Sequence, residues 1–296
     1  MKYGTKLTDW YCVSWLATIA FVALFDETKA QWQQWGGSNR DFTVEATGLA
    51  DKWPEGGPRK LWKRELGDGY SSIVVDGGLL YTMYRAGSEQ ASVALDVLTG
   101  RTVWEQRNPS PYDPSKDAEI GRGPNSTPLI SGNRIFTIGT QSVIHCFDKQ
   151  TGKILWRRDL VDELGARVFR YGYGSSPLAY KELLIAVVDR PRRELVGHGQ
   201  ETILEAGEAR SVGQARTLMA FDQRSGEIVW SSQDFIVDHS SPLLLNFRGE
   251  DQIVLYLNEG IVAVAPDNGQ LLWHYEVERH GHDMTPLWLD GDIVVT

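Results

Sequence analysis

The sequence predicts an all-β fold, a β-propeller of four-stranded antiparallel blades with about four full blades plus partial ones. Three observations predict it. A hairpin that ends in tryptophan recurs along the chain, short apolar runs alternate with turn residues, and glycine accounts for 30 of the 296 residues. Four short strands and one aromatic marker per repeat of about 40–50 residues are typical of propeller blades.

The recurring hairpin carries a glycine four residues before its tryptophan, and glycine adopts positive φ without strain. In three copies an aspartate precedes that glycine by four residues, where its carboxylate can accept bonds from turn amides. These residues predict a tight turn between the third and fourth strands of each blade. The four copies are LDVLTGRTVW (Leu95–Trp104), FDKQTGKILW (Phe147–Trp156), FDQRSGEIVW (Phe221–Trp230) and VAPDNGQLLW (Val264–Trp273).

The tryptophans of these hairpins are expected to be structural and mostly buried at equivalent places in successive blades. A buried indole removes about 150–250 Å² from water, and one blade cannot bury both of its faces alone. A further tryptophan in RKLWKREL has the same fourth-strand pattern but no blade before it. The five structural tryptophans are Trp62, Trp104, Trp156, Trp230 and Trp273.

The two ends of the sequence predict a leader and an incomplete ring. Residues 1–30 are interpreted as a signal peptide because a short apolar run, Val13–Phe25, follows a positive start. An uncleaved membrane anchor is the alternative. Residues 31–57 are expected to form an extended segment and 58–296 the propeller, incomplete at its C-terminal end. Because the last unit stops in its second strand, we expect an open arc or an imperfect ring, with Trp62 more exposed than Trp156. The alternative is a closed five-blade ring, in which the Trp62 strand pairs with Ile293–Thr296.

Net charge and cysteine content limit the classes of partner and the crosslinks expected for this chain. The net charge of −9 argues against a nucleic acid. Of the two cysteines, Cys12 lies in the predicted signal peptide, so the mature chain is expected to hold no internal disulfide. Cys146 lies within a strand pattern and is expected to be a small core residue. The predicted location is periplasmic or secreted, with membrane contact only through an uncleaved signal segment.

The pattern of an SSP loop, then ALD, then TG and tryptophan resembles the PQQ-like, or quinoprotein-type, β-propeller repeat. The resemblance runs from about Trp62 to the end, and QWGGSNRD, WPEGGPRKLWK and DGYSS resemble a secreted bacterial subgroup. The family includes PQQ-dependent alcohol dehydrogenases and the non-enzymatic propeller lipoprotein of the outer-membrane assembly (Bam) complex. The repeat is specific for the fold and much less so for the function.

The resemblance implies what an enzyme of this family would need. It is expected to use an adjacent Cys-Cys pair, a tryptophan floor, and a calcium site of Glu, Asn and Asp with a catalytic Asp. This sequence has no Cys-Cys pair, and no matching cluster can be assigned. No catalytic residue and no cofactor are therefore predicted. PQQ and calcium enter only under the alternative of a quinoprotein dehydrogenase.

Long connections point to one face of the propeller as the binding face. The insertion Asp189–Arg216 replaces a tight hairpin between second and third strands, and such hairpins emerge on the same face as the connections between blades. The residues that lead into each innermost strand are expected to form a polar rim there, with turn chemistry and strand capping as the alternative. The rim candidates are Tyr70, Ser71, Asn125, Tyr173, Ser175, His239 and Asp283.

Two further clusters contain residue types that can carry chemistry. His274, His280, His282 and Asp283 include metal-ligand types, but the spacing fixes no third ligand, so no metal site is predicted. The stretch Asp238–Ser241 contains the residue types of a hydrolytic triad. Because adjacent strand residues point to opposite faces, no triad is predicted there. The leading interpretation is a binding or assembly scaffold with a protein or polymer partner on the binding face. The alternatives are a quinoprotein oxidoreductase, or a degenerate relative of one, and a carbohydrate- or polymer-binding propeller.

Overall fold

The fold consists of antiparallel sheets that follow one another along the chain, in a computed structural model. The structure describes residues 31–44, 48, 50–111, 123–166, 168, 172–189, 217–235, 237, 239–258, 260–277, 284–289 and 293–295. In this part of the chain, no helix is long and apolar enough to cross a membrane.

Four sheets have four strands each, and in every one the strands lie side by side in chain order. The prediction of four full propeller blades is therefore confirmed. The strands are β1 (Val74–Asp76), β2 (Leu79–Ala86), β3 (Glu89–Asp96) and β4 (Thr102–Pro109) in blade 1; β5 (Leu129–Ser131), β6 (Arg134–Ile138), β7 (Val143–Asp148) and β8 (Ile154–Asp159) in blade 2; β9 (Leu178–Tyr180), β10 (Leu183–Val187), β11 (Leu218–Asp222) and β12 (Ile228–Ser232) in blade 3; β13 (Leu243–Phe247), β14 (Glu250–Leu257), β15 (Gly260–Val264) and β16 (Leu271–Glu276) in blade 4.

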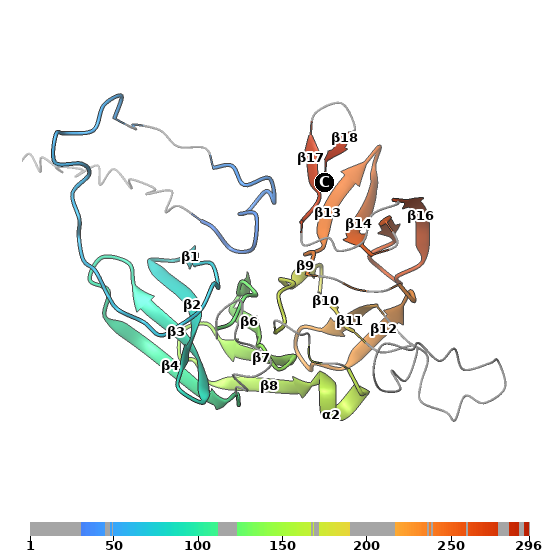
Figure 1. Ribbon diagram of the computed structural model, residues 1–296, viewed down its shortest axis with the longest axis horizontal. Coiled ribbons are helices and arrows are strands. Elements are labelled where there is room, and N and C mark those ends of the chain that lie inside the picture. The colour runs from blue at the N-terminus through green and yellow to red at the C-terminus, as the bar shows by residue number, and fades with distance from the viewer. Residues whose placement is uncertain are drawn as a thin grey trace, which may run out of the picture.

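A two-stranded sheet, β17 (Leu287–Leu289) and β18 (Ile293–Val295), follows blade 4. Figure 1 shows the sheets standing side by side in an arc, from blade 1 at the left to the β17–β18 pair at the upper right. One short helix, α2 (Leu160–Leu164), follows β8, begins at the N-cap Asp159 and ends at the left-handed Gly165.

The antiparallel order divides the connections between two faces. The turn between the second and third strands of a blade and the connection to the next blade lie on one face, which we call the loop face. The turns between first and second strands, and the glycine hairpins between third and fourth strands, lie on the opposite face. This division fixes where each predicted site residue can lie.

The glycine hairpins have the predicted geometry. Their glycines have φ values of +68°, +70°, +74° and +71° at Gly100, Gly152, Gly226 and Gly269. In blade 2 the Asp148 carboxylate accepts the amide of Thr151 at 2.8 Å and its hydroxyl at 2.7 Å. These bonds hold the pKa of Asp148 below its usual value. Blade 4 has Ala265 at the corresponding position and so lacks this carboxylate.

The hairpin tryptophans of blades 1 to 3 contact the hairpin of the following blade. The Trp104 indole donates to the Lys149 carbonyl at 2.9 Å, and a Cβ added at Gly152 would lie 2.5 Å from that indole. The contact recurs with the same spacing, since the accepting carbonyl always stands three residues before the glycine. The other indole donors and their acceptors are Trp62 to Val97 at 2.8 Å, Trp156 to Gln223 at 3.0 Å and Trp230 to Pro266 at 3.2 Å.

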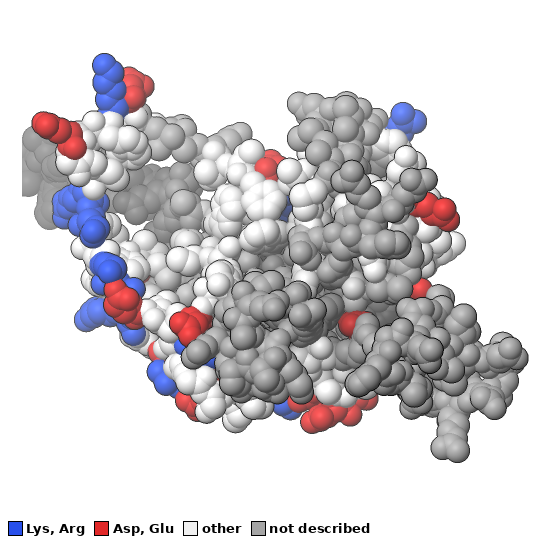
Figure 2. Space-filling model, in the orientation of Figure 1, with Lys and Arg blue, Asp and Glu red and all other residues white. Residues whose placement is uncertain are grey.

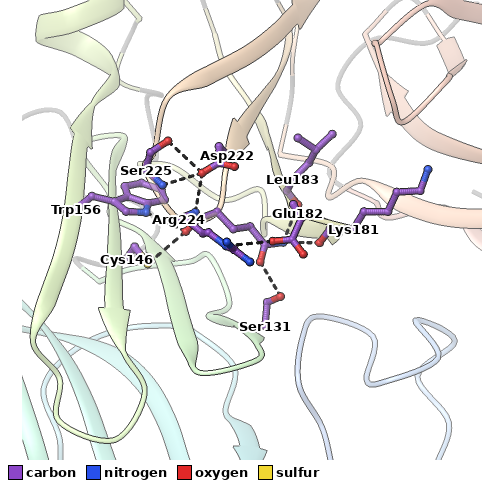
Figure 3. A network of polar contacts seen from close by, with 10 residues as sticks. Ser131, Cys146, Trp156, Lys181, Glu182, Leu183, Asp222, Arg224 and Ser225 are labelled. Carbon is purple, nitrogen blue, oxygen red and sulfur yellow. Dashed lines mark hydrogen bonds and ion pairs between the residues drawn. The ribbon is translucent and has the colours of Figure 1, made fainter.

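Gln223 shows how one residue joins two blades (Figure 3). Its carbonyl receives the Trp156 indole of blade 2, and its side-chain amide donates to the carbonyls of Lys181 and Leu183 within blade 3. Its amide oxygen accepts the Ser131 hydroxyl of blade 2 at 2.8 Å. The blade 2–3 contact is therefore held by hydrogen bonds in both directions, around an apolar cluster of both blades.

A small residue stands opposite each hairpin tryptophan in the ladder. Trp156 pairs with Cys146, where the other three blades pair their tryptophan with an alanine, and a register shift follows at once in all four. Cys146 is fully buried, as predicted. Burial raises the pKa of its thiol to about 12, which makes it a packing residue.

Of the two predictions about tryptophan burial, one is confirmed and one is wrong. Trp62 is partly buried and more exposed than Trp156, as predicted. The prediction that Trp273 is mostly buried is wrong, because its side chain is 37% exposed against 9% for Trp230. Its indole donates instead to Gln252 of its own blade, at 2.8 Å. Among the described residues, no glycine hairpin lies against Trp273.

The predicted orphan strand around Trp62 is also corrected. Residues 58–66 form no named strand, and within the described ranges Trp62 makes no ladder with Ile293–Val295. Trp62 nevertheless makes the same contact as its counterparts, since its indole lies against Gly100. The tryptophan contact and a hydrogen bond from the Arg64 guanidinium to the Gly100 carbonyl at 3.0 Å hold this segment to blade 1 without strand pairing.

Candidate functional site

The rim residues predicted from the leading loops divide into accessible and buried ones. Tyr70 is 63% exposed, while its backbone amide donates to the Pro124 carbonyl of the neighbouring leading loop at 2.9 Å. Ser71 and Asn125 are half-buried beside it in sequence or in space. The start of blade 1 therefore presents an aromatic side chain on a backbone that the next blade holds in place.

Tyr173 and Ser175 do not belong to an accessible rim. Tyr173 is 1% exposed, and its hydroxyl donates to the Val187 carbonyl at 2.8 Å inside blade 3. Burial raises the pKa of this hydroxyl far above its usual value. Ser175 is likewise buried. Both residues pack the interior, which corrects their assignment to a binding rim.

The hydroxyls that follow these positions join successive blades. Ser176 accepts the amide of Thr127 at 3.0 Å, and Ser241 accepts the amide of Ser176 at 2.9 Å. The SSP motifs thus place a buried serine where it satisfies an amide of the preceding blade. Turn and capping chemistry, the alternative considered for these serines, describes Ser176 and Ser241.

The remaining candidates lie nearer to the C-terminal end. His239 is half-buried in the leading loop of blade 4, and Asp283 lies outside the described residues. Of the metal-ligand types, His274 is on β16, where its ring packs edge-on against Phe235 with centroids 5.0 Å apart. His280 and His282 lie outside the described residues. In the described ranges, no group of three or more His, Cys, Asp or Glu residues could hold a metal ion.

The insertion Asp189–Arg216 lies almost wholly outside the described residues. Only Asp189 of Asp189–Arg216 is described. Its placement on the loop face therefore stays a prediction.

The N-terminal segment contacts several blades, which the sequence patterns did not predict. Trp32 exchanges two backbone hydrogen bonds with Val75 of β1, at 3.0 and 2.8 Å. The carbonyl of Gln33 accepts the Ile130 amide of β5. The Arg40 guanidinium donates to the Ala179 carbonyl of β9, and the Trp35 indole donates to the Thr285 hydroxyl before β17 at 2.9 Å. Figure 1 shows this blue segment reaching from blade 1 into the arc.

Part of the predicted extended segment is therefore a compact turn. Arg40 and Phe42 adopt positive φ, and the rings of Trp35 and Phe42 pack edge-on with centroids 5.2 Å apart. Gly36 and Gly37 permit the close approach, since a Cβ at Gly37 would lie 2.8 Å from the Trp32 ring.

The structure also has a polar recess between blades 1 and 2 that was not predicted from the sequence. It opens at the loop face with a volume of about 150 Å³. Strand parity explains how it forms, because alternate residues of β3 and β4 face the alternate residues of β7 and β8. Its polar lining residues are Gln90, Asn108, Ser110, Gln141, His145 and Arg157.

Charged side chains of both signs lie beside one another on part of the surface. Figure 2 shows Lys and Arg next to Asp and Glu along the left and lower edges of the visible face. Several exposed pairs are ion pairs, such as Lys63 with Glu65 at 2.6 Å and Lys181 with Asp267 at 2.9 Å. Such exposed pairs contribute little to stability.

Comparisons with known proteins agree with the fold. The family model described as outer membrane protein assembly factor BamB matches residues 88–295. The chain is 28% identical over 190 residues to quinohemoprotein alcohol dehydrogenase ADH IIB of Pseudomonas putida, covering 62% of this chain and 23% of that protein. It is 20% identical over 229 residues to BamB of Kangiella koreensis, covering 77% of this chain and 48% of that protein.

The solved structure of quinohemoprotein alcohol dehydrogenase ADHIIG from Pseudomonas putida HK5 has the same fold with a TM-score of 0.54 and 16% identity. The match covers 83% of this chain and 40% of that one. The chain spans less than half the length of the curated relatives given above. Since the family model covers most of the four blades and the β17–β18 pair, the chain belongs to the BamB-like family of PQQ-repeat β-propellers.

Proposed function

We propose that this protein is a binding scaffold of the bacterial cell envelope, periplasmic or secreted, that holds a protein partner on its loop face. Two of its matches are assembly factors or their family model, named for outer-membrane protein assembly. The resemblance supports the class of function, and the identity of the partner is a separate question.

The observation that carries the proposal is the exposure of Tyr70 on a fixed backbone. A tyrosine that is 63% exposed offers a large amphipathic surface, and such residues are enriched among the energetic centres of interfaces. The hydrogen bond to Pro124 holds its backbone before any partner binds, so little conformational entropy is lost on binding. Half-buried Ser71 and Asn125 supply the polar surroundings of such an anchor.

The second candidate function is a quinoprotein oxidoreductase, favoured by the 28% identity to an alcohol dehydrogenase of that class. The described residues do not fit the site that the resemblance implies. Cys146 is buried opposite Trp156, has no cysteine beside it in the sequence, and its thiol is held protonated by burial. PQQ and calcium are therefore assigned no residues of this chain.

A site-specific crosslinking experiment tests the scaffold proposal. A photoreactive phenylalanine analogue placed at Tyr70 of the full chain should crosslink one discrete envelope protein in its native cells. The matched control is the same analogue at Leu98, which is 73% exposed in the β3–β4 hairpin on the face opposite the loop face. Equal crosslinking from both positions, or none from Tyr70, would count against the loop face as the docking surface.

Titration with PQQ and calcium separates the two candidates. We expect no saturable quenching of tryptophan fluorescence by PQQ up to micromolar concentrations and no dye-linked oxidation of alcohols. Saturable binding together with alcohol oxidation would reverse the ranking and make the oxidoreductase the leading function.

A further inference from the structure

The blade 1–2 interface changes character along its length. Far from the loop face it is apolar, with Tyr81, Trp104 and Phe147 packed together. Toward the loop face the same strands present Gln90, Asn108 and His145 to one another across the recess. The next interface is apolar at two of the corresponding places, with Leu160 in place of Asn108 and Met219 in place of His145, while Ser142 corresponds to Gln90.

His145 is the residue that departs furthest from the repeat. It directly precedes the small residue opposite the blade tryptophan, and the other three blades place Val93, Met219 and Val262 there. Its imidazole is 6% exposed and stacks on Phe147 at 5.5 Å between ring centroids. A polar ring at a position that elsewhere holds an aliphatic side chain needs a compensating partner.

That partner is missing within the described structure. The Nε2 atom of His145 is buried without a hydrogen bond, and so is the hydroxyl of Thr137, which lies directly opposite His145 in the ladder. Leaving such groups unsatisfied destabilises the folded state. Since both belong to the same side of β6 and β7, one polar occupant of this interface would relieve both.

The surrounding groups determine the chemistry of an occupant. The Gln90 side-chain oxygen accepts the Thr140 amide at 3.1 Å, while among the described residues its NH₂ group donates only to the thioether of Met83 at 3.5 Å, a weak acceptor. The Ser110 hydroxyl lies 3.0 Å from that of Thr140. Amides and hydroxyls both donate and accept, so they match a ligand that carries neighbouring hydroxyl groups.

Of the titratable groups that line the recess, Arg157 is paired and His145 is neutral, and the buried Arg85 guanidinium behind it donates to the Ser110 and Thr140 hydroxyls at 3.1 Å. The Arg157 guanidinium holds the Asp159 carboxylate at 2.7 Å. Burial, and the Arg157 charge, lower the pKa of His145 to about 4, so the imidazole is neutral at pH 7. A neutral imidazole offers one donor and one acceptor. The site therefore matches an uncharged ligand better than an anion.

We propose that the recess between blades 1 and 2 binds a small uncharged polyhydroxylated ligand, such as one sugar ring of a glycan. A volume of about 150 Å³ corresponds to about five water molecules at bulk density, enough for one such ring. The recess is lined by β3, β4, β7 and β8 and by the loop residues Ser110, Gly139 and Gln141, and the leading loop of Tyr70 does not line it. The proposal therefore does not rest on the scaffold function.

Calorimetric titration of the full chain tests the proposal with glucose and N-acetylglucosamine as probes, and with sulfate as the anionic comparison. We expect saturable binding of at least one sugar and none of sulfate. Gln90→Leu and His145→Val should each weaken that binding at least tenfold. The matched control is Met219→Leu, which changes the position of blade 3 that corresponds to His145 and should leave sugar binding unchanged.

A stability measurement keeps the result interpretable. Because valine stands at this place in blades 1 and 4, His145→Val should fold and melt at the same or a higher temperature than the unaltered protein without sugar. A clear fall in melting temperature would show that the imidazole is a structural group and would overturn the proposal. Absence of saturable binding of either sugar, binding that survives both recess variants, or preferential binding of sulfate would overturn it as well.

Discussion

Trp230 and Trp273 occupy equivalent positions in neighbouring blades and have different surroundings. The Trp230 indole lies between its own blade and the hairpin of blade 4, donates to Pro266, and is 9% exposed. Trp273 is 37% exposed and bonds to Gln252 of its own blade. Their strands have closely similar sequences, IVW and LLW, and the same register opposite an alanine. An indole is therefore fully enclosed only where the hairpin of a following blade covers it. Trp62, which meets such a hairpin but has no blade of its own, is partly buried, so the tryptophan's own blade contributes as well.

The largest effect that sharpens this comparison should come from removing an enclosed indole. Trp156→Ala should lower the free energy of unfolding by about 3–5 kcal/mol, because it leaves a cavity between blades 2 and 3 and an unsatisfied Gln223 carbonyl. Trp273→Ala, the control, should cost about 1–2 kcal/mol, since much of that indole already meets water. Urea unfolding monitored by circular dichroism measures both, and equal losses would refute the comparison.

A glycine substitution separates backbone strain from the contact with the indole. Gly152→Ala places a Cβ 2.5 Å from Trp104 at a φ of +70°, whereas Gly132→Ala has a φ of +56° and open space around its Cβ. Both variants carry the strain of a left-handed residue, about 1–2 kcal/mol. Gly152→Ala should lose about 1–3 kcal/mol more in urea unfolding, from overpacking. Equal losses would mean that the indole yields without cost.

The hairpin carboxylate should give a smaller, pH-dependent effect. The Thr151 hydroxyl and amide hold the pKa of Asp148 below its unfolded value. A carboxyl group with a lowered pKa in the folded state adds stability above the unfolded pKa, and that stability is lost as pH falls through the folded pKa. Asp148→Asn should therefore reduce stability at pH 7 and much less at pH 3, in parallel urea titrations. A deficit that is the same at both pH values would contradict this role.

Cys146→Ala should have the smallest effect, below about 1 kcal/mol, because alanine already stands at this place in the other three blades. In a Cys12→Ser background, the buried Cys146 thiol should react with a maleimide only after the protein is unfolded in urea. Rapid labelling of the native protein would show that the blade 2–3 interface opens readily.

Much of the fold could be predicted from the sequence because each local signal agrees with the repeat. The glycine hairpins, the aspartate turns and the small residue opposite the tryptophan all concern neighbouring residues or adjacent strands. The burial of Trp273 could not be predicted from its own hairpin, since it depends on a contact with another blade. The turn around Arg40 also depends on residues far away in the sequence, because Arg40 bonds to Ala179 and Trp35 bonds to Thr285.

The candidate site was harder to predict for a similar reason. Residues of the same type in the leading loops differ in burial, since Tyr70 is exposed and Tyr173 is buried. The recess depends on the parity of two strands in each of two blades. Its one sequence signal was the histidine at a position that holds aliphatic residues in the other repeats, and that signal becomes visible only when the repeats are aligned by their tryptophans.

A double-mutant cycle between Trp156 and Gly226 tests the central claim most directly. A Cβ added at Gly226 would lie 2.7 Å from the Trp156 ring across the blade interface. Gly226→Ala should cost about 1–3 kcal/mol more in the unaltered protein than in a Trp156→Leu background, where the indole no longer meets the new methyl group. Costs that agree within about 0.5 kcal/mol in the two backgrounds would contradict the claim that each tryptophan is enclosed by the hairpin of the following blade.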